Sequence, residues 1–492
     1  MQDVIVVGGG ISGLVCAYQL KQLGRNVLLI DGSNRVGGVM KSESVDGFLF
    51  ERGPNSFYIT PEISELLDSI GISPYLVTAD SSAPRFVYYK GKLRPVPVPT
   101  SPLKFLSSFL TTRLLSPLAK LRLFAEPFIA PSTSGQEQTI EEFITRRFGK
   151  QFHDVLVSSF VSGVYAGDTS ELSAMASPPF SKLADLEAEH GSVIRGAFRS
   201  KKTVSAKTGE PPRRSHQSCS FLNGLETLPK ALHKALVNEL LLNCKIHGIE
   251  FHNHAPQAHY TLEVEFCGDR QPIHTASLVV ATPAYTAARL LNPLSDKLAD
   301  TLDKIPYPPL ASVALAFKES QLKLQPGTSL QGFGFLIPRS EGVRTLGCIW
   351  NSSLFPERAP QGYVTLTCFI GGSTDPEVLT LSDEDIIRTV HKDLQQTLGV
   401  TGAPRVLGVT RWERAIPQYT LGHPSRRTEI EEQVGRYPGL YLTGNYMYGV
   451  SIGDCIGQAQ RIAEQVEEFL ERTIPPSTGV NQYPRTGSDL LL

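Results

Sequence analysis

Three glycines near the start of the chain, followed by an acidic residue, have the spacing of a dinucleotide-binding turn. Gly8, Gly10 and Gly13 form a G-x-G-x-x-G pattern after an apolar run, and Asp31 closes the next apolar run. Glycine is needed there because close approach of the backbone to a pyrophosphate leaves no room for a Cβ atom. The helix that follows offers free N–H groups and a positive dipole. The expected contacts are Gly8, Gly10, Ile11, Ser12, Gly13, Asp31 and Gly32; the alternative is a tight turn without a ligand.

The residues after the acid favour FAD over NAD. Arg35, Gly37 and Gly38 follow Asp31, and Ser42 lies beyond them. A long ligand that lies extended through the protein needs backbone clearance at this point and a cation near its phosphates. This D/E-x4-R-x-G-G pattern resembles that of the FAD-binding amine-oxidase superfamily, and the likeness covers the full length of the chain. The usual acid of that family is Glu, so the shorter Asp31 must lie closer to the ribose hydroxyls.

Further segments occur in the order in which this family has them. Phe50-Glu51-Arg52-Gly53-Pro54 resembles the turn where the backbone passes the flavin ring, and residues 221–225 resemble its F-x-x-G-(L/M) turn. Segments that begin at Trp412, Leu442 and Gly449 resemble those that close over the isoalloxazine and ribityl groups. The resemblance implies noncovalent FAD, because no Cys or His invites a covalent bond. The further contacts that it implies are Arg35, Gly37, Gly38, Gly53, Pro54, Ile246, Trp412, Gly444, Asn445, Val450, Ser451 and Ile452.

Within this superfamily the chain resembles the protoporphyrinogen oxidases, in particular their plant-type members. Residues 85–97 resemble that family's R-(F/Y)-(V/L/I)-x-x-x-G-x-L-x-x-(V/L)-P stretch, and residues 162–168 resemble its S-G-V-(Y/F)-A-G-(D/N) string. Segments that begin at Gly332, Ser352 and Phe369 follow in family order. The resemblance implies oxidation of protoporphyrinogen IX to protoporphyrin IX in heme or chlorophyll biosynthesis. Three two-electron steps would remove six electrons, with O2 reduced to H2O2.

The resemblance also implies which residues bind the porphyrinogen. They are Arg85, Leu336, Ile349, Phe369, Ala166 and Gly167. The planar guanidinium of Arg85 would pair with a propionate; the alternative is a surface ion pair. The three large apolar side chains would sandwich the tetrapyrrole, unless they are ordinary core residues, and the Ala166-Gly167 turn would line the pocket with backbone. The reaction needs no catalytic triad or carboxylate pair, because the cofactor carries the chemistry. Asp454 stands where many plant-type members have Arg, which leaves the local electrostatics open.

The composition argues against several other classes of protein. The net charge is −1, which gives no overall attraction to nucleic acid. Seven scattered cysteines without a C-x-x-C pair are typical of a reducing compartment. His252 and His254 lie in a polar turn without a cysteine or carboxylate cluster, so we expect no metal site. The chain runs directly into a strand and has no apolar window long enough to span a membrane, so we expect a cytoplasmic protein.

A chain of 492 residues predicts several lobes, which must position these side chains. Apolar runs at residues 4–7 and 26–30, around a helical pattern at 11–22, predict a βαβ unit. Further strands are expected at residues 244–251, 277–281 and 439–443, and a helix at 456–470. The predicted fold is α/β, α+β overall: a Rossmann-type FAD domain (1–80, 215–286 and 408–473), a mixed-sheet substrate domain (81–86 and 287–407), a helical membrane-associated domain (87–200), a mobile loop (201–214) and a disordered tail (474–492).

Residues 103–128 predict contact with a membrane surface. They are dense in Leu and Phe, with four Lys or Arg residues against the single acid Glu126. Such a basic amphipathic stretch can lie in a bilayer interface; alternatively it folds its apolar stripe onto its own core. We expect peripheral, monotopic binding at the cytoplasmic membrane face. The expected partners are the porphyrinogen, O2, a second copy of the chain, and ferrochelatase or magnesium chelatase as acceptor of the product.

Three other functions stay open. A coproporphyrinogen III oxidase would share the fold and the reaction, but it needs a more cationic pocket for four propionates. Carotenoid desaturases and amine oxidases share the FAD motifs, although we would not expect the porphyrinogen-type strings in them. A prenyl-chaperone-like binding protein would have lost the flavin, and the intact Gly444-Asn445-Tyr446 segment argues against it.

Overall fold

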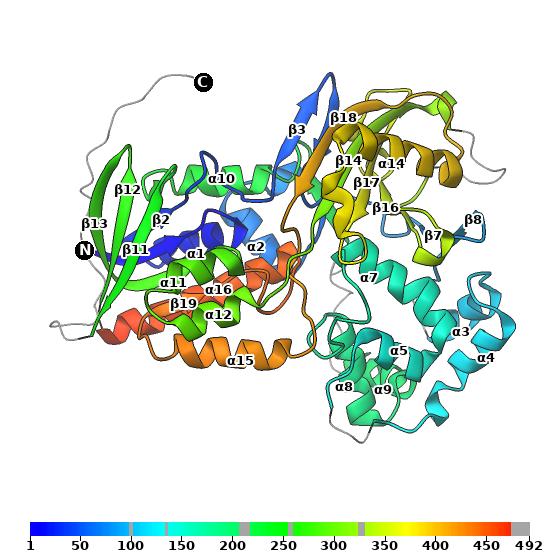
Figure 1. Ribbon diagram of the computed structural model, residues 1–492, viewed down its shortest axis with the longest axis horizontal. Helices are drawn as coiled ribbons and strands as arrows, with labels where there is room; N and C mark the ends of the chain where they lie inside the picture. The colour runs from blue at the N-terminus through cyan, green and yellow to red at the C-terminus, as the bar shows by residue number, and fades with distance from the viewer. Residues whose placement is uncertain (98–101, 133–135, 206–216, 254–258, 323–329, 474–492) are drawn as a thin grey trace.

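The computed structural model describes residues 1–97, 102–132, 136–205, 217–253, 259–322 and 330–473. The protein has a mixed α/β fold with three parts (Figure 1). A helix-covered sheet lies at the left of the view, a second sheet at the upper right and a helical lobe at the lower right.

The first sheet has the strand order β10-β2-β1-β13-β12-β11, and β19 also pairs with β13. Its strands are β1 (Gln2–Val7), β2 (Val27–Ile30), β10 (Leu240–Leu241), β11 (Lys245–His252), β12 (His259–Phe266), β13 (Asp269–Val280) and β19 (Leu440–Leu442). Helices α1 (Ile11–Gln22), α2 (Pro61–Ser69), α10 (Thr227–Ala235) and α16 (Ile452–Thr473) pack on one face. Helices α11 (Ala284–Leu291), α12 (Asp296–Asp303) and α15 (His423–Val434) pack on the other. Because both faces are covered, strands such as β2 are apolar at every position.

The predicted βαβ unit is confirmed as β1, α1 and β2, and the strands expected near 277–281 and 439–443 are the end of β13 and β19. The strand expected at 244–251 is β11, which pairs antiparallel with β12 at the edge of the sheet. The short β10 takes the parallel position beside β2.

The second sheet has the order β18-β14-β17-β16-β15-β7-β8. Its strands are β7 (Arg85–Tyr89), β8 (Lys92–Pro95), β14 (Leu310–Lys318), β15 (Gly334–Leu336), β16 (Thr345–Trp350), β17 (Tyr363–Gly371) and β18 (Arg405–Trp412). Helix α14 (Asp383–Leu398) packs on one face and forms a core with it. Two small sheets pair β3 (Ser42–Val45) with β4 (Phe48–Glu51), and β9 (Ser218–Phe221) with β5 (Phe57–Tyr58) and β6 (Leu76–Thr78).

The helical lobe packs around its own apolar core. Its helices are α3 (Pro102–Thr111), α4 (Pro117–Phe124), α5 (Ile140–Phe148), α6 (Lys150–Phe152), α7 (Ser158–Tyr165), α8 (Phe180–His190) and α9 (Val193–Ser205). Glu126 is buried in this lobe, pairs with Arg147, and accepts hydrogen bonds from Ser192 Oγ (2.6 Å) and the backbone N–H of Val193 (3.0 Å). The carboxylate thereby holds the start of α9. No helix in the described part of the chain has the length and apolarity to cross a membrane.

The structure corrects two of the predicted domain boundaries. Residues 87–95 were assigned to the helical domain, but they form most of the β7–β8 hairpin, because Lys90 and Gly91 at its turn both take positive φ angles (52° and 70°). Residues 287–305 were assigned to the substrate domain, but α11 and α12 bury their apolar sides on the first sheet.

Smaller corrections concern the ends of other elements. Residues 408–412 belong to β18 of the second sheet rather than to the FAD domain. Helix α16 begins already at Ile452, before the predicted position. Helix α9 extends to Ser205, into the predicted loop 201–214. The rest of that loop and the tail 474–492 lie outside the described residues.

Candidate functional site

The glycine turn after β1 is shaped by backbone contacts. A Cβ atom at Gly13 would lie 1.9 Å from the carbonyl oxygen of Gly8, and one at Gly8, where φ is +112°, would lie 2.8 Å from that of Ala281. A Cβ at Gly10 would meet no atom within 4 Å. Gly8 and Gly13 are therefore required by the fold, whereas Gly10 faces open space at the beginning of α1. That helix has no side-chain cap and no acidic residue in its first turn, which includes Ile11 and Ser12.

Two further loops bring glycines against this turn. The backbone N–H of Gly37 donates to the carbonyl of Gly9 (2.7 Å), and a Cβ at Gly38 would lie 3.4 Å from the Cα of Gly10. A Cβ at Gly53, just before Pro54, would lie 2.0 Å from the carbonyl oxygen of Val39. Segments far apart in the sequence thus form one backbone-lined cradle at the beginning of α1.

The carboxylate of Asp31 lies over the glycine turn. Its Oδ2 accepts a hydrogen bond from the backbone N–H of Gly9 (2.5 Å), and its Oδ1 accepts one from Ser33 (2.7 Å). The backbone N–H of Cys244 donates to the carbonyl of Asp31 (3.0 Å), which brings Ile246, at the start of β11, to the same end of the cradle. Each carboxylate oxygen keeps a lone pair for a ribose hydroxyl.

Arg35, which is expected to neutralise phosphates, donates to backbone carbonyls of its own loop. Its Nη1 donates to the carbonyls of Val36 (3.0 Å) and Met40 (3.1 Å), its Nη2 donates to the carbonyl of Gly38, and it lies 3.8 Å from Glu226. The guanidinium therefore shapes the loop that carries Gly37 and Gly38, because its donors point at loop carbonyls.

A turn from β19 into α16 closes the cradle. Thr443, which precedes Gly444 and Asn445, donates its N–H to the carbonyl of Val280 (3.1 Å) at the end of β13. Ser451 lies just before α16, after Val450, and accepts a hydrogen bond from the N–H of Asp454 (3.1 Å). Asp454 Oδ2 in turn accepts from the N–H (3.1 Å) and Oγ (2.6 Å) of Ser451. This reciprocal cap explains why α16 begins at Ile452, and it gives Asp454 a structural role.

The residues of the cradle fit an extended dinucleotide. The uncapped end of α1 suits a pyrophosphate, Asp31 suits a ribose, and Gly10 leaves the space that a bound group needs. The hydroxyl of Thr443 is buried without a hydrogen-bond partner among the described residues, so a polar group is still lacking there.

The predicted substrate residues of the second sheet share one of its faces. Gly334 on β15 pairs with both Arg85 on β7 and Ile349 on β16. Leu336 pairs with Gly347, and Gly347 pairs with Phe369 on β17. Since side chains alternate between the faces of a sheet, Arg85, Ile349, Leu336 and Phe369 all lie opposite the core that α14 covers. We call this surface the slot face.

Helix α7 packs against the slot face. A Cβ at Gly163 of α7 would lie 2.3 Å from Leu336 Cδ2, and one at Gly347 would lie 3.0 Å from the same atom. The two glycines therefore make room for Leu336. Ala166, which ends α7 with φ +52°, packs with Phe369 and accepts a hydrogen bond from the N–H of Ser373 (2.8 Å).

Gly167 follows Ala166 and is held from behind by Gln418. A Cβ at Gly167 would lie 2.4 Å from Gln418 Oε1, and Gln418 Nε2 donates to the carbonyl of Tyr165 (2.9 Å). The structure therefore brings the Ala166-Gly167 turn to the slot face and fixes it there.

Arg85 places a cation on the slot face. Its guanidinium lies 4.9 Å from the centre of the Phe333 ring, and its Nη2 donates to Tyr58 Oη (3.3 Å). No carboxylate among the described residues forms an ion pair with it, which differs from the surface ion pair considered as the alternative. Ile349 packs in the same small cluster as Phe333. A partly exposed guanidinium thus remains available at the edge of an apolar wall.

The slot face also meets the cradle. Trp412 and Gly371 both pair with Leu310, so Trp412 lies on the face that carries Phe369. Ser312, on the same face, donates from its Oγ to the carbonyl of Arg52 (3.4 Å), which directly precedes Gly53. The expected cofactor turn and the expected substrate walls therefore lie next to each other.

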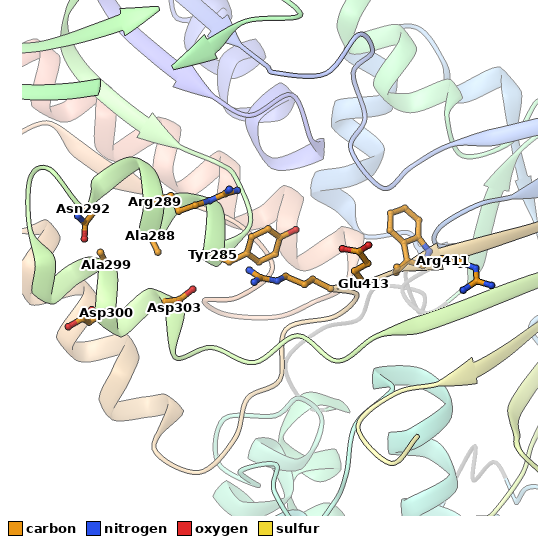
Figure 2. A pocket seen from close by; sticks show the side chains of 11 residues that line it. Tyr285, Ala288, Arg289, Asn292, Ala299, Asp300, Asp303, Arg411 and Glu413 are labelled. Atoms are coloured by element: carbon orange, nitrogen blue, oxygen red, sulfur yellow. The ribbon is translucent and has the colours of Figure 1, made fainter. Parts of the chain in front are cut away.

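Trp412 also lines a charged cleft of about 940 Å³ between α11, α12 and the end of β18. Figure 2 shows Arg289, Asp300 and Asp303 on the two helices, with Glu413 and Arg411 toward β18. Arg411 forms an ion pair with Asp383, and its Nε donates to Asp383 Oδ1 (2.7 Å). The cleft has walls of both charges and none of the expected substrate contacts, so it does not suit an apolar tetrapyrrole.

A buried ion pair that sequence reasoning did not assign joins β4 to the turn at residues 356–358. Arg358 Nη1 lies 3.0 Å from Glu51 Oε1, and the two residues are 2% and 3% exposed. Glu51 also accepts from the N–H of Leu225 (3.0 Å) and from Ser42 Oγ (2.5 Å). Burial raises the pKa of the Glu51 carboxyl, and Arg358 opposes this shift. Both residues stand in family-like strings, which was the signal available, but nothing in the sequence paired them.

Comparison with known proteins agrees with this arrangement. The family "Flavin containing amine oxidoreductase" matches residues 11–467. The chain is 37% identical over 488 residues to protoporphyrinogen oxidase 1, chloroplastic, of Arabidopsis thaliana, across 96% of this chain and 89% of that protein. It is 30% identical over 486 residues to coproporphyrinogen III oxidase of Bacillus subtilis (strain 168), across 95% and 98%. A solved structure from Exiguobacterium sp. 255-15, assigned as a protoporphyrinogen oxidase, superposes with a TM-score of 0.76 at 26% identity, across 94% and 98%.

Proposed function

This chain belongs to the flavin-containing amine oxidoreductases, as an FAD-dependent oxidoreductase of the porphyrinogen oxidase family, and we propose that its substrate is protoporphyrinogen IX. The product is protoporphyrin IX. Three two-electron steps remove six electrons and six protons, and three O2 molecules become three H2O2. The FAD is held without a covalent bond.

The observation that carries this proposal is the charge of the slot face. Arg85 has no carboxylate partner among the described residues, and its neighbours on the face are Ile349, Leu336 and Phe369. Arg94 on β8 shares the face, and its Nε donates to the carbonyl of Tyr89 (3.0 Å). Coproporphyrinogen III has four propionates and protoporphyrinogen IX has two, so an apolar wall whose guanidinium groups without a carboxylate partner among the described residues are those of Arg85 and Arg94 favours the latter.

The residues of the slot face position the substrate and exclude water. Arg85 pairs with one propionate, and its planar fork fixes the tilt of the ring system. Leu336 and Phe369, with the backbone of Ala166 and Gly167, form a dry wall around the methylene bridges. The chemistry that bound FAD supplies is two-electron oxidation with transfer of the electrons to O2. The cradle residues Gly10, Asp31 and Gly53 would hold that group beside the slot face.

Anaerobic mixing tests the substrate directly. Purified protein with bound FAD is mixed with protoporphyrinogen IX or coproporphyrinogen III while flavin absorbance is followed. We expect both to bleach the flavin, with a larger kcat/KM for protoporphyrinogen under aerobic turnover. If neither compound bleaches the flavin, porphyrinogen oxidation is contradicted. If kcat/KM is clearly larger for coproporphyrinogen III, the choice of substrate is contradicted.

The helical lobe also exposes apolar side chains, which supports a peripheral membrane contact. Leu118 and Leu121 on α4 are 79% and 68% exposed, and Phe128 follows them at the surface. In Figure 1, α3 and α4 lie on the outer side of this lobe, away from the first sheet. Lys120 and Arg122 lie on the same helix, and their cationic groups donate to backbone carbonyls of the lobe, so the apolar side chains carry this proposal.

Vesicle sedimentation tests this contact. A Leu118→Glu and Leu121→Glu double variant should lose binding to anionic phosphatidylglycerol vesicles and keep turnover of detergent-dispersed substrate. Val237→Glu is the matched control, because Val237 is also exposed but lies after α10 on the first sheet. Equal binding by the double variant and the wild type contradicts the contact.

A further inference from the structure

The turn that closes the cradle has little regular structure of its own. Residues 443–451 connect β19 to α16, and Gly444 and Gly449 take φ angles of +150° and +149°. Backbone groups outside helices and strands need other hydrogen-bond partners when they are buried. The conformation of this turn therefore depends on side chains from other parts of the molecule.

One hydroxyl group connects both ends of the turn. Tyr419 Oη donates to the carbonyl of Asn445 (2.6 Å) and accepts from the N–H of Gly449 (2.8 Å). Tyr419 is only 4% exposed, so water does not replace these bonds when they are lost. Since Asn445 and Val450 are expected cofactor contacts, the hydroxyl fixes the backbone at the first and directly before the second.

Groups outside the turn hold Tyr419 itself. Its ring stacks on His423 at the start of α15, with centroids 4.2 Å apart and planes 10° apart. Its carbonyl accepts a hydrogen bond from the N–H of Ser173 (2.8 Å) in the helical lobe. The hydroxyl is thus positioned by α15 and the helical lobe, and it transmits that position to the turn.

The protonation state suits this role. Burial raises the pKa of the Tyr419 hydroxyl well above its usual value. The group therefore stays neutral, and it can donate to one carbonyl while it accepts from one N–H.

We propose that Tyr419 is a positioning residue that holds the turn 443–451 in the conformation that binds FAD. The inference rests on the proposed noncovalent binding of FAD, and it does not depend on which porphyrinogen is oxidised. Tyr419 acts through the backbone of Asn445 and Gly449 and transfers no proton itself.

The test is the affinity for FAD of a Tyr419→Phe variant, measured by flavin fluorescence titration of the protein after FAD has been removed. The expected result is a dissociation constant about tenfold higher than that of the wild type, which corresponds to about 1.4 kcal/mol. The rise in melting temperature on addition of FAD should shrink with it. A wild-type dissociation constant in this variant overturns the proposal.

Tyr260→Phe is the matched control. Tyr260 is fully buried on the first sheet and donates from its hydroxyl to the carbonyl of Pro438 (2.9 Å), which is not part of the turn. The control should lower stability without changing the FAD dissociation constant. If it weakens FAD binding as much as Tyr419→Phe does, Tyr419 has only a general structural role.

A second variant covers the case in which Tyr419→Phe does not fold. His423→Ala leaves the hydroxyl in place but frees the ring, so FAD should bind about threefold more weakly. An unchanged dissociation constant contradicts the proposal. A wild-type protein that binds FAD but does not oxidise protoporphyrinogen would overturn the proposed substrate and leave this inference standing.

Discussion

The cradle is built from backbone atoms, whereas the slot face is built from side chains. A Cβ atom added at Gly13 or Gly53 would lie 1.9 Å or 2.0 Å from a carbonyl oxygen. The slot face is made of side chains from strands far apart in the sequence, such as Arg85 and Phe369. A site built from backbone requires glycine at fixed spacings along the sequence. A site built from side chains requires only that residues on neighbouring strands fit each other, and these residues have no fixed spacing in the sequence. The first is therefore visible in a sequence and the second is not.

The largest effect on stability is expected from breaking the buried ion pair of Arg358 with Glu51, which lies two residues before Gly53 of the cradle. Arg358→Met leaves the Glu51 carboxyl buried without its cation, so the free energy of unfolding should fall by about 3–5 kcal/mol. Chemical denaturation followed by circular dichroism measures this. The double variant Glu51→Leu and Arg358→Met should lose less, because no charge remains. A loss below about 1 kcal/mol in the single variant contradicts a structural role for the pair.

Two glycine variants separate packing from ligand approach within the cradle. Gly13→Ala places a Cβ against the Gly8 carbonyl, so the free energy of unfolding should fall by about 3 kcal/mol. Gly10→Ala meets open space and has an ordinary φ of −70°, so folding stability should change little while FAD affinity falls. Urea denaturation and FAD titration of both variants check this. Equal effects on stability would contradict the distinction.

Acid should weaken the cradle side through His423. This side chain is 1% exposed, and burial, with Arg426 and Arg427 nearby, lowers its pKa from 6.5 to about 4. As pH falls, the unfolded state binds the His423 proton at a higher pH than the folded state does. The contribution of neutral His423 to the free energy of unfolding is therefore complete above pH 6.5 and is lost as pH falls toward about 4. The full loss is about 3 kcal/mol.

The His423→Phe variant isolates that contribution. It keeps a ring beside Tyr419 but cannot titrate, so its stability should depend less on pH between about 6.5 and 4 than that of the wild type. Denaturation curves across this interval make the comparison. Parallel pH profiles for the two proteins would show that His423 does not titrate as described.

The sequence predicted the cradle well because local rules govern it. Apolar runs and glycine spacing located β1, α1 and β2, with Asp31 at the end of β2. The β7–β8 hairpin was missed because Lys90 in its turn takes a left-handed conformation, and lysine is not a residue type that predicts this conformation. Helices α11 and α12 were placed with the wrong sheet, since an amphipathic pattern shows that a helix is covered but not which sheet covers it.

The slot face was reachable only through the resemblance. Nothing local to Leu336 indicates that Gly163 and Gly347 make room for it. The pattern around Arg35 suggested a phosphate contact, but it could not show that the Nη1 group of Arg35 donates to loop carbonyls. The role of Tyr419 was not predicted, because its partners Asn445 and Gly449 lie far along the chain. A single tyrosine also forms no periodic pattern in the sequence.

The proposed binding of a porphyrinogen propionate by Arg85 on the slot face is tested most directly by changing both partners. We would compare kcat/KM for protoporphyrinogen IX and its dimethyl ester on the wild type and on Arg85→Ala. Folding should be unaffected, because Arg85 makes one long hydrogen bond and a ring contact. We expect the wild type to prefer the free acid by about tenfold, or about 1.4 kcal/mol, and Arg85→Ala to have no preference. A variant that keeps the full preference for the free acid would contradict it.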